Sequence, residues 1–219
     1  GYLQTFTTSS DGNTITQVLE KEWGTKNDVY YPSFIQMSED TYLIAYYGYN
    51  SGTKHDGNSV SNTWGQWLSV FQIKSDGSVI NELGNFLHDT YTNSDPYNDL
   101  IKIDDDTYAL AYKSYNYGPQ TSGSWGGWIK TFKVNGGNIN QVNELQHYTS
   151  SDSYWHSWER LSATTYALAW QGSGGDGYIT TFTISTDGAT ITEIAELEHD
   201  GNNGSYNSFA KLDDDTYVL

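Results

Sequence analysis

One short segment recurs along this chain and constrains its fold more than any other feature. Its fullest copy reads DDDTYALAY, in which an acidic tight turn leads through Thr-Tyr into an apolar strand. The copies occupy residues 38–46, 104–112, 162–170 and 213–219. The last copy stops at Leu219, where the others continue with Ala-Tyr or Ala-Trp. Such repetition is typical of arrays and propellers.

Two further elements recur in step with this segment. A short strand that starts with an aromatic residue precedes each copy, at 31–37, 97–103, 155–161 and 206–212. A predicted hairpin also recurs, at 2–22, 67–88, 128–147 and 178–199. Its turn is Asp11-Gly12 in the first copy and Gly136-Gly137 in the third, and we expect positive φ at both turn residues. We name the four strands of one repeat a (31–37-like), b (41–46-like), and c and d (the two arms of the hairpin).

The pattern predicts an all-β chain, since no segment shows a helical period. Four-stranded antiparallel units repeated in a ring are β-propeller blades. We therefore predict one domain, 1–219, with repeats at approximately 1–46, 65–112, 127–170 and 177–219. The fold is a four-bladed β-propeller in which one blade is closed by the N-terminal c–d and the C-terminal a–b strands. Such closure would remove exposed sheet edges.

Charge excludes several classes of partner. The chain carries 10 basic and 27 acidic residues, a formal net charge of -17. Nucleic acid is not an expected partner, because its phosphates require Lys and Arg. Membrane insertion is not expected either, because no apolar run is long enough to span a bilayer. The chain has no cysteine and begins at Gly1, so we expect no disulfides and a processed or partial chain.

The repeats resemble tandem β-propeller repeats of microbial and viral secreted or cell-surface proteins. The turns SSDGNT (9–14) and STDGAT (185–190) also resemble a shortened sialidase Asp-box. Sialidase activity is not implied, because that family clamps its carboxylate substrate with three arginines and this chain has only Arg160. The resemblance implies the fold and a secreted or cell-surface location.

The b–c and d–a connections fall on one face of such a propeller and carry all the variable loops, so we place the binding site there. Aromatic candidates start each strand a: Tyr31, Tyr97, Trp155 and Tyr206. Others lie in the predicted b–c loops: Tyr49, Trp64, Tyr115, Tyr117 and Trp125. Flat aromatic rings beside amides suit sugars, although the strand-a set has the alternative of filling gaps between blades.

Other polar features give no catalytic or metal site. The clusters 104–106 and 213–215 raise the possibility of calcium, but the spacing favours turns with Asp side chains capping backbone N–H groups. The repeat-equivalent His88, His147 and His199 fall in separate blades, and His156 has no obvious partner. We expect no cofactor and no catalytic residues.

These observations favour a non-catalytic module that binds a glycan or surface ligand. A structural or adhesive subunit of an extracellular assembly is the alternative, and self-association is a second kind of partnership. A glycoside hydrolase or lyase is the third reading, since carboxylates are abundant.

Overall fold

The computed structural model describes residues 1–23, 29–54, 56–90, 95–116 and 124–219. These residues form β-strands and one short 3-10 turn, η1 (Ser173–Gly175), so the all-β prediction is confirmed. None of the helical residues in these ranges forms a segment long and apolar enough to cross a membrane. The chain divides into two compact units, which are described separately.

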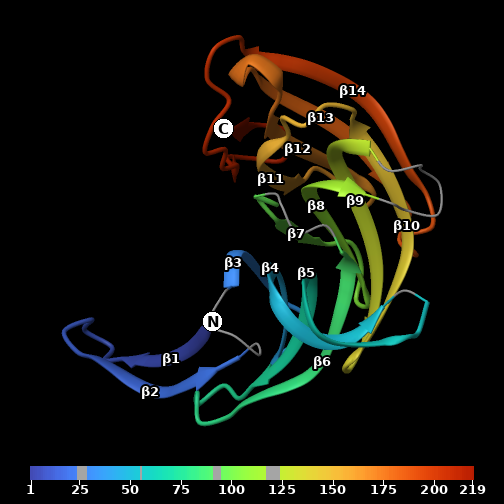
Figure 1. The fold of residues 1–219 in the computed structure, drawn as a ribbon. Coiled ribbons are helices and arrows are strands. Elements are labelled where there is room, and N and C mark those ends of the chain that lie inside the picture. The colour runs from blue at the N-terminus through green and yellow to red at the C-terminus, as the bar shows by residue number, and fades with distance from the viewer. Residues whose placement is uncertain (24–28, 55, 91–94, 117–123) are drawn as a thin grey trace. The chain divides into compact units, whose positions relative to one another are not determined.

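The first unit comprises Gly1–Thr90 with Asn135–Ile139. A two-stranded sheet pairs β1 (Tyr2–Thr8) with β2 (Ile15–Glu22). A four-stranded sheet follows in the order β3-β4-β5-β6 (Figure 1). Its strands are β3 (Val29–Gln36), β4 (Thr41–Lys54), β5 (Ser59–Ile73) and β6 (Ile80–Asp89).

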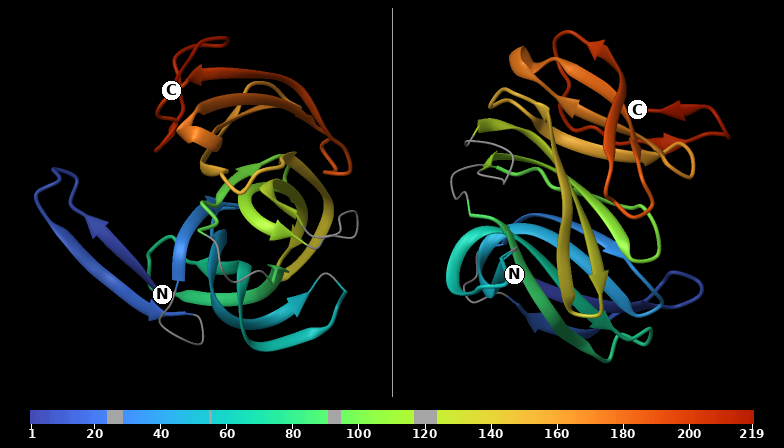
Figure 2. Two further views of the ribbon diagram at one scale, coloured as in Figure 1. Left: turned by 45° about the horizontal axis from the view of Figure 1, so that its top comes forward. Right: turned by 90° about the vertical axis from the view of Figure 1, so that its right-hand side faces the viewer.

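The second unit comprises Tyr91–Val134 with Asn140–Leu219. It holds two four-stranded sheets and one two-stranded sheet, also visible in Figure 2. The first contains β7 (Asp99–Lys102), β8 (Thr107–Asn116), β9 (Ser124–Asn135) and β10 (Asn138–Tyr148). The second contains β11 (Tyr154–Arg160), β12 (Thr165–Gln171), β13 (Gly177–Ile184) and β14 (Ile191–Asp200). The small sheet pairs β15 (Ala210–Lys211) with β16 (Tyr217–Val218).

The three four-stranded sheets share one strand register. The Tyr of strand b lies opposite the Phe of strand c in all three four-stranded sheets: Tyr42↔Phe71, Tyr108↔Phe132 and Tyr166↔Phe182. Three fully buried tryptophans mark the end of b or the start of c: Trp67, Trp128 and Trp170. Within each unit the core lies between neighbouring sheets, because the d strand of one repeat packs on strands b and c of the next. In the first unit, for example, Trp23 packs edge-on against Tyr46 and Phe71.

The c–d turns are built differently from the prediction. Positive φ is found at the glycine alone, as at Gly12 (φ 73°), and not at the preceding Asp. Gly12 N donates to Ser9 O, while Asp11 accepts from Ser9 Oγ and Asn13 N, so the Asp side chain closes the turn. In two later copies the turn glycine contacts strand c of the preceding repeat, because Thr5 Oγ1 donates to Gly77 O at 2.8 Å and Thr131 Oγ1 donates to Gly188 O at 2.7 Å.

The expected closure of a fourth blade is not found. In the described residues β1 pairs only with β2 and β16 only with β15, each in a separate two-stranded sheet. The reason is that the last two strands hold only two residues each, and these residues pair with one another. The structure therefore supports a multi-sheet, propeller-like all-β fold, and a fourth four-stranded sheet is not found among the described residues.

The b–c connections also differ from the predicted loops. Strand β4 continues to Lys54 and β5 begins at Ser59, so most of the predicted loop at 48–66 is paired strand. Tyr49 lies directly opposite Trp64 in this extension. Cross-strand aromatic pairs of this kind stabilise antiparallel sheets, which explains why a segment with loop-like composition forms a ribbon.

Candidate functional site

The aromatic residue that starts each strand a has a left-handed backbone. The φ values are 51° at Tyr31, 47° at Tyr97, 55° at Trp155 and 60° at Tyr206. Bulky side chains rarely adopt this conformation, which costs on the order of 1–3 kcal/mol at each position. Its recurrence in every repeat shows that the surrounding contacts enforce it. In β3 and β11 the pairing register with strand b shifts at the same point.

Three of these residues form a row in the second unit. The ring centroids of Tyr97 and Trp155 are 4.4 Å apart, and those of Trp155 and Tyr206 are 4.0 Å apart. Tyr206 ends the row and is 77% exposed. Tyr31 belongs to the first unit and is partly exposed. The strand-a aromatics thus pack on their counterparts in neighbouring repeats, and a ligand role for them stays a prediction.

Hydrogen bonds link the same residues from repeat to repeat. Asn207 Nδ2, next to Tyr206, donates to Trp155 O at 3.1 Å. His156 Nδ1 bonds to Tyr97 O at 3.0 Å in the equivalent place. Two residues further along, Trp158 N donates to Asp99 Oδ2 at 2.7 Å. The first two bonds are made to the backbone carbonyls of left-handed residues, Trp155 and Tyr97, and so link each of these residues to the next repeat.

His156 differs from its counterpart Asn207 in its second partner, which is a side-chain hydroxyl where Asn207 has the Gly204 carbonyl. Its Nε2 lies 2.9 Å from Ser153 Oγ, and both residues are buried. Tyr97 O can only accept a hydrogen bond, so the ring proton lies on Nδ1 and Nε2 is the acceptor. Ser153 Oγ–H therefore donates to Nε2. This is the arrangement of a serine nucleophile, a histidine base and a third group that orients the base.

The electrostatic surroundings keep this histidine neutral. Burial lowers the pKa of His156 to about 4, and the Lys113 charge acts in the same direction, against the Tyr97 carbonyl bond that raises it. The neighbouring His147, 5.7 Å away between ring centroids, has a pKa lowered well below its usual value by burial and by His156. Neutral imidazole is the form that accepts a proton.

Lys113 is the buried cation of this region. Its Nζ lies 3.8 Å from the ring centroid of Tyr154 and 5.7 Å from that of Trp125, a cation–π geometry. Burial lowers the pKa of Lys113, while Asp152 and Asp95 act to raise it. Buried groups with displaced pKa values gather at functional sites more often than elsewhere, so the region of Lys113, His147 and His156 is the candidate site.

Gly127 of β9 lies against Ser153 and His147. Any side chain at this position would overlap Ser153 Oγ and His147 Nε2. Neither ring nitrogen of His147 has a hydrogen-bond partner among the described residues. Ser153 has no exposed surface, so a molecule that reaches its hydroxyl must displace the start of β9.

The aromatics of the predicted b–c loops lie on strand extensions. Tyr49 and Trp64 form an edge-on pair with centroids 5.7 Å apart in the first unit. Tyr115 and Trp125 form the equivalent pair, 5.6 Å apart, in the second unit. Tyr117 lies outside the described residues. A ligand role for this set stays a prediction.

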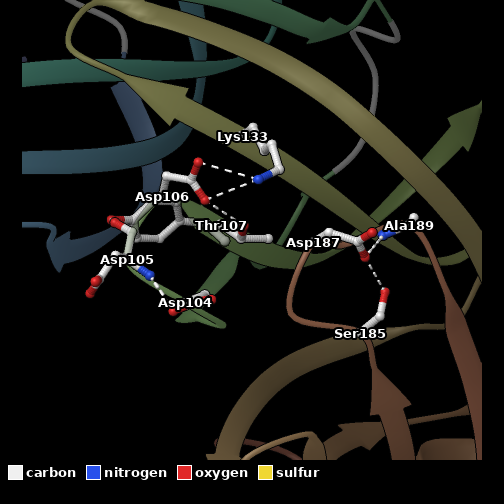
Figure 3. A network of polar contacts seen from close by, with 9 residues as sticks. Asp104, Asp105, Asp106, Thr107, Lys133, Ser185, Asp187 and Ala189 are labelled. Atoms are coloured by element: carbon white, nitrogen blue, oxygen red, sulfur yellow. Dashed lines mark hydrogen bonds and ion pairs between the residues drawn. The ribbon is translucent and has the colours of Figure 1, made fainter.

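The acidic segment 104–106 acts as a turn. Asp105 N donates to Asp104 Oδ1 at 2.8 Å, and Asp106 accepts from Thr107 Oγ1 at 2.9 Å (Figure 3). The Thr107 hydrogen bond lowers the pKa of Asp106, and Lys133 Nζ, 3.2 Å from Asp106 Oδ1, lowers it further. The described residues hold no group of three or more potential metal ligands.

The Ser153–His156 contact was missed in the sequence because the repeat was aligned for what its copies share. At these two positions the neighbouring repeats carry Asp95 with Asn98, and Gly204 with Asn207. Departure from the repeat at two positions three residues apart was the available signal. It could not show that the two side chains face each other.

Comparisons with known proteins give structural likenesses alone. No family model matches the chain, and no curated protein sequence matches it. A protein from Lactobacillus plantarum aligns with a TM-score of 0.43 and 9% identity, over 88% of this chain and 64% of its own. A protein from Bacteroides fragilis, provisionally named a 6-phosphogluconolactonase, aligns with a TM-score of 0.31 and 7% identity, over 89% and 77%.

The second likeness corrects the hypothesis of a non-catalytic binding module, because a chain with a similar strand arrangement bears an enzyme's name. The expectation that the protein is not an enzyme is withdrawn with it. Both TM-scores are below 0.5, so neither likeness transfers an activity or a substrate to this chain.

Proposed function

We propose that the protein is a serine-dependent hydrolase of uncharged esters or lactones, with Ser153 as nucleophile and His156 as general base. The observation that carries the proposal is the relay from Ser153 Oγ through His156 to Tyr97 O. Comparison with Asn207 separates the two hydrogen bonds of this relay. The bond to the preceding carbonyl is common to both repeats, whereas the bond to a serine occurs in one.

In the proposed reaction His156 Nε2 takes the Ser153 proton as Oγ attacks the substrate carbonyl. The ester C–O bond breaks, and the leaving oxygen takes the proton from the imidazolium. Water then attacks the acyl-serine with the same base, which releases the acid and restores the hydroxyl. Burial is the main cause of the lowered pKa of His156, which keeps the imidazole unprotonated before the attack, and the positive charge of Lys113 acts in the same direction.

Charge and access define the substrate class. The net charge of -17 repels anions, so uncharged substrates are favoured over phosphorylated ones. Ser153 lies under Gly127, so the proposal includes displacement of the start of β9 as the substrate enters.

The test is hydrolysis of p-nitrophenyl acetate and glucono-δ-lactone by the wild type and by Ser153→Gly. Glycine is the residue at the equivalent position 204, so this variant is the one most compatible with the fold. We expect turnover in the wild type and a loss of about 10³-fold or more in the variant. Equal turnover by both proteins, or none in the wild type, would overturn the proposal. A 6-phosphorylated lactone should be hydrolysed more slowly than the uncharged one.

A further inference from the structure

His147, near the end of β10, has a well-packed ring but two unpaired ring nitrogens. The ring centroid lies 5.2 Å from that of Trp170 and 6.3 Å from that of Phe182. Nδ1 and Nε2 are both buried and have no hydrogen-bond partner among the described residues. A buried polar group left unpaired costs free energy, and in native structures it usually serves a bound water, an ion or a ligand. Packing therefore accounts for the ring of His147 and not for its nitrogens.

The unpaired Nε2 borders the same small space as the hydroxyl of Ser153. A Cβ placed on Gly127 would overlap both His147 Nε2 and Ser153 Oγ, so the two atoms lie on either hand of one missing carbon. One carbonyl group can therefore touch both of them, with its carbon at Oγ and its oxygen at Nε2.

The fourth repeat keeps the glycine and the histidine but has no nucleophile. A Cβ on Gly177 would lie 2.6 Å from His199 Nε2 and 2.9 Å from the Cα of Gly204, which stands at the position of Ser153. His199 is exposed, so water can bond to its ring. The contact between glycine and histidine is thus common to both repeats, whereas the third repeat combines it with buried, unpaired nitrogens and a hydroxyl.

We propose that neutral His147 donates a hydrogen bond from Nε2–H to the carbonyl oxygen of the substrate, an assignment that rests on the proposed function of Ser153. As Oγ bonds to the carbonyl carbon, the hydroxyl proton passes to His156 and the π electrons of the carbonyl move onto its oxygen. His147 stabilises the negative charge that forms there. The C=O bond then re-forms, the ester C–O bond breaks, and the leaving oxygen takes the proton from His156. His147 keeps its own proton throughout.

The surroundings of His147 suit this role. No acceptor among the described residues holds its proton on Nδ1. A carbonyl oxygen can only accept, so a bound substrate selects the Nε2–H tautomer. Burial and His156 lower the pKa of His147 well below its usual value, so the ring is a neutral donor. The charge of Lys113, which acts on His156, also favours negative charge on an oxygen beside it.

The test compares two variants of His147 in the hydrolysis of p-nitrophenyl acetate. His147→Leu removes the donor, whereas His147→Gln keeps an N–H group. We expect kcat to decrease by about 10²–10³-fold in the leucine variant, with KM changed by less than about threefold, and to stay within about tenfold of the wild type in the glutamine variant. His199→Leu is the matched control. It loses the equivalent contact with a glycine in the repeat that has no nucleophile, so its kcat should equal that of the wild type.

Inhibition by an uncharged trifluoromethyl ketone supplies a second readout, because its hemiketal with Ser153 carries the same oxyanion. It should bind about 10²-fold more weakly to His147→Leu than to the wild type. Unchanged kcat and inhibitor affinity in His147→Leu, while Ser153→Gly has lost turnover, would overturn the role of His147 alone. Equal losses in a folded His147→Gln and in His147→Leu would do the same, since the donor would not be what was lost. A wild type without turnover would overturn the proposed function and this role with it.

Discussion

The third and fourth strands a start in the same way and differ in what they can do. Trp155 and Tyr206 both have positive φ. The residue after each of them donates a hydrogen bond to the backbone carbonyl of the equivalent aromatic residue in the preceding repeat. In the fourth repeat that residue is Asn207, whose amide also bonds to Gly204 O. In the third repeat it is His156, and the second bond goes to the Ser153 hydroxyl. A repeated structural contact has thus acquired a titratable group and a nucleophile at one of its copies.

The largest effect is expected when position 156 is given the residue that the fourth repeat carries at position 207. His156→Asn keeps a donor for Tyr97 O, as Asn207 shows, but removes the base. Hydrolysis should decrease by about 10²–10⁴-fold, while the free energy of unfolding changes by about 1 kcal/mol or less.

His156→Leu is the matched control for stability. It leaves Tyr97 O without its donor and should cost about 1–3 kcal/mol more than the Asn variant in chemical denaturation. Equal stability of the two variants would show that the Nδ1 bond has no structural role.

Trp155 tests the strain that both strands share. Trp155→Ala removes two ring contacts and should destabilise the fold by about 2–4 kcal/mol. Because φ is 55° here, Trp155→Gly should be about 1 kcal/mol more stable than the alanine variant. Urea denaturation of both variants measures the difference. The reverse order would show that the left-handed conformation stores no strain.

The pH dependence of stability distinguishes histidine from asparagine at position 156. The pKa of His156 is about 4 in the folded protein, below the ordinary value of 6.5, so the unfolded chain binds the proton more tightly. Stability is then complete above pH 6.5 and decreases as the pH falls toward 4, by on the order of 3 kcal/mol from this residue. The decrease between pH 7 and pH 4 should be smaller in His156→Asn by about that amount. Identical pH profiles for the two proteins would contradict the assigned burial.

A second hydrogen bond between repeats joins a backbone N–H of strand a to a side chain of the preceding repeat. We expect it to be stronger at Trp158, in the third repeat, than at Phe209, in the fourth. Asp99→Ala removes a charged acceptor 2.7 Å from Trp158 N and should cost about 1.5–3 kcal/mol. Ser157→Ala removes the equivalent acceptor, 3.4 Å from Phe209 N, and should cost about 0.5–1 kcal/mol. Thermal melts in parallel measure both changes, and equal losses would remove the distinction.

Regular features of this fold were accessible from the sequence. The repeat of DDDTYALAY predicted the strands, and the structure adds that the strand-b Tyr lies opposite the strand-c Phe in all three complete sheets. The turn glycines at 12 and 188 were recognisable because only glycine adopts positive φ without cost.

The site was not accessible for a physical reason. Contact between Ser153 and His156 depends on the left-handed backbone of Trp155, which redirects the chain between them. Aromatic residues give no signal for that conformation, which arises from packing against the next repeat. The extension of β4 and β5 past residue 48 was missed similarly, since pairing between Tyr49 and Trp64 outweighs the loop-like composition.

The most direct test of the account is the labelling of Ser153 by an uncharged fluorophosphonate, followed by intact-mass and peptide analysis. Only a serine activated by a neighbouring base reacts quickly with such a reagent. The account predicts one adduct per chain, located at Ser153, that forms at least about 10²-fold more slowly in His156→Asn. An unlabelled Ser153, or the same labelling rate in both proteins, would contradict it.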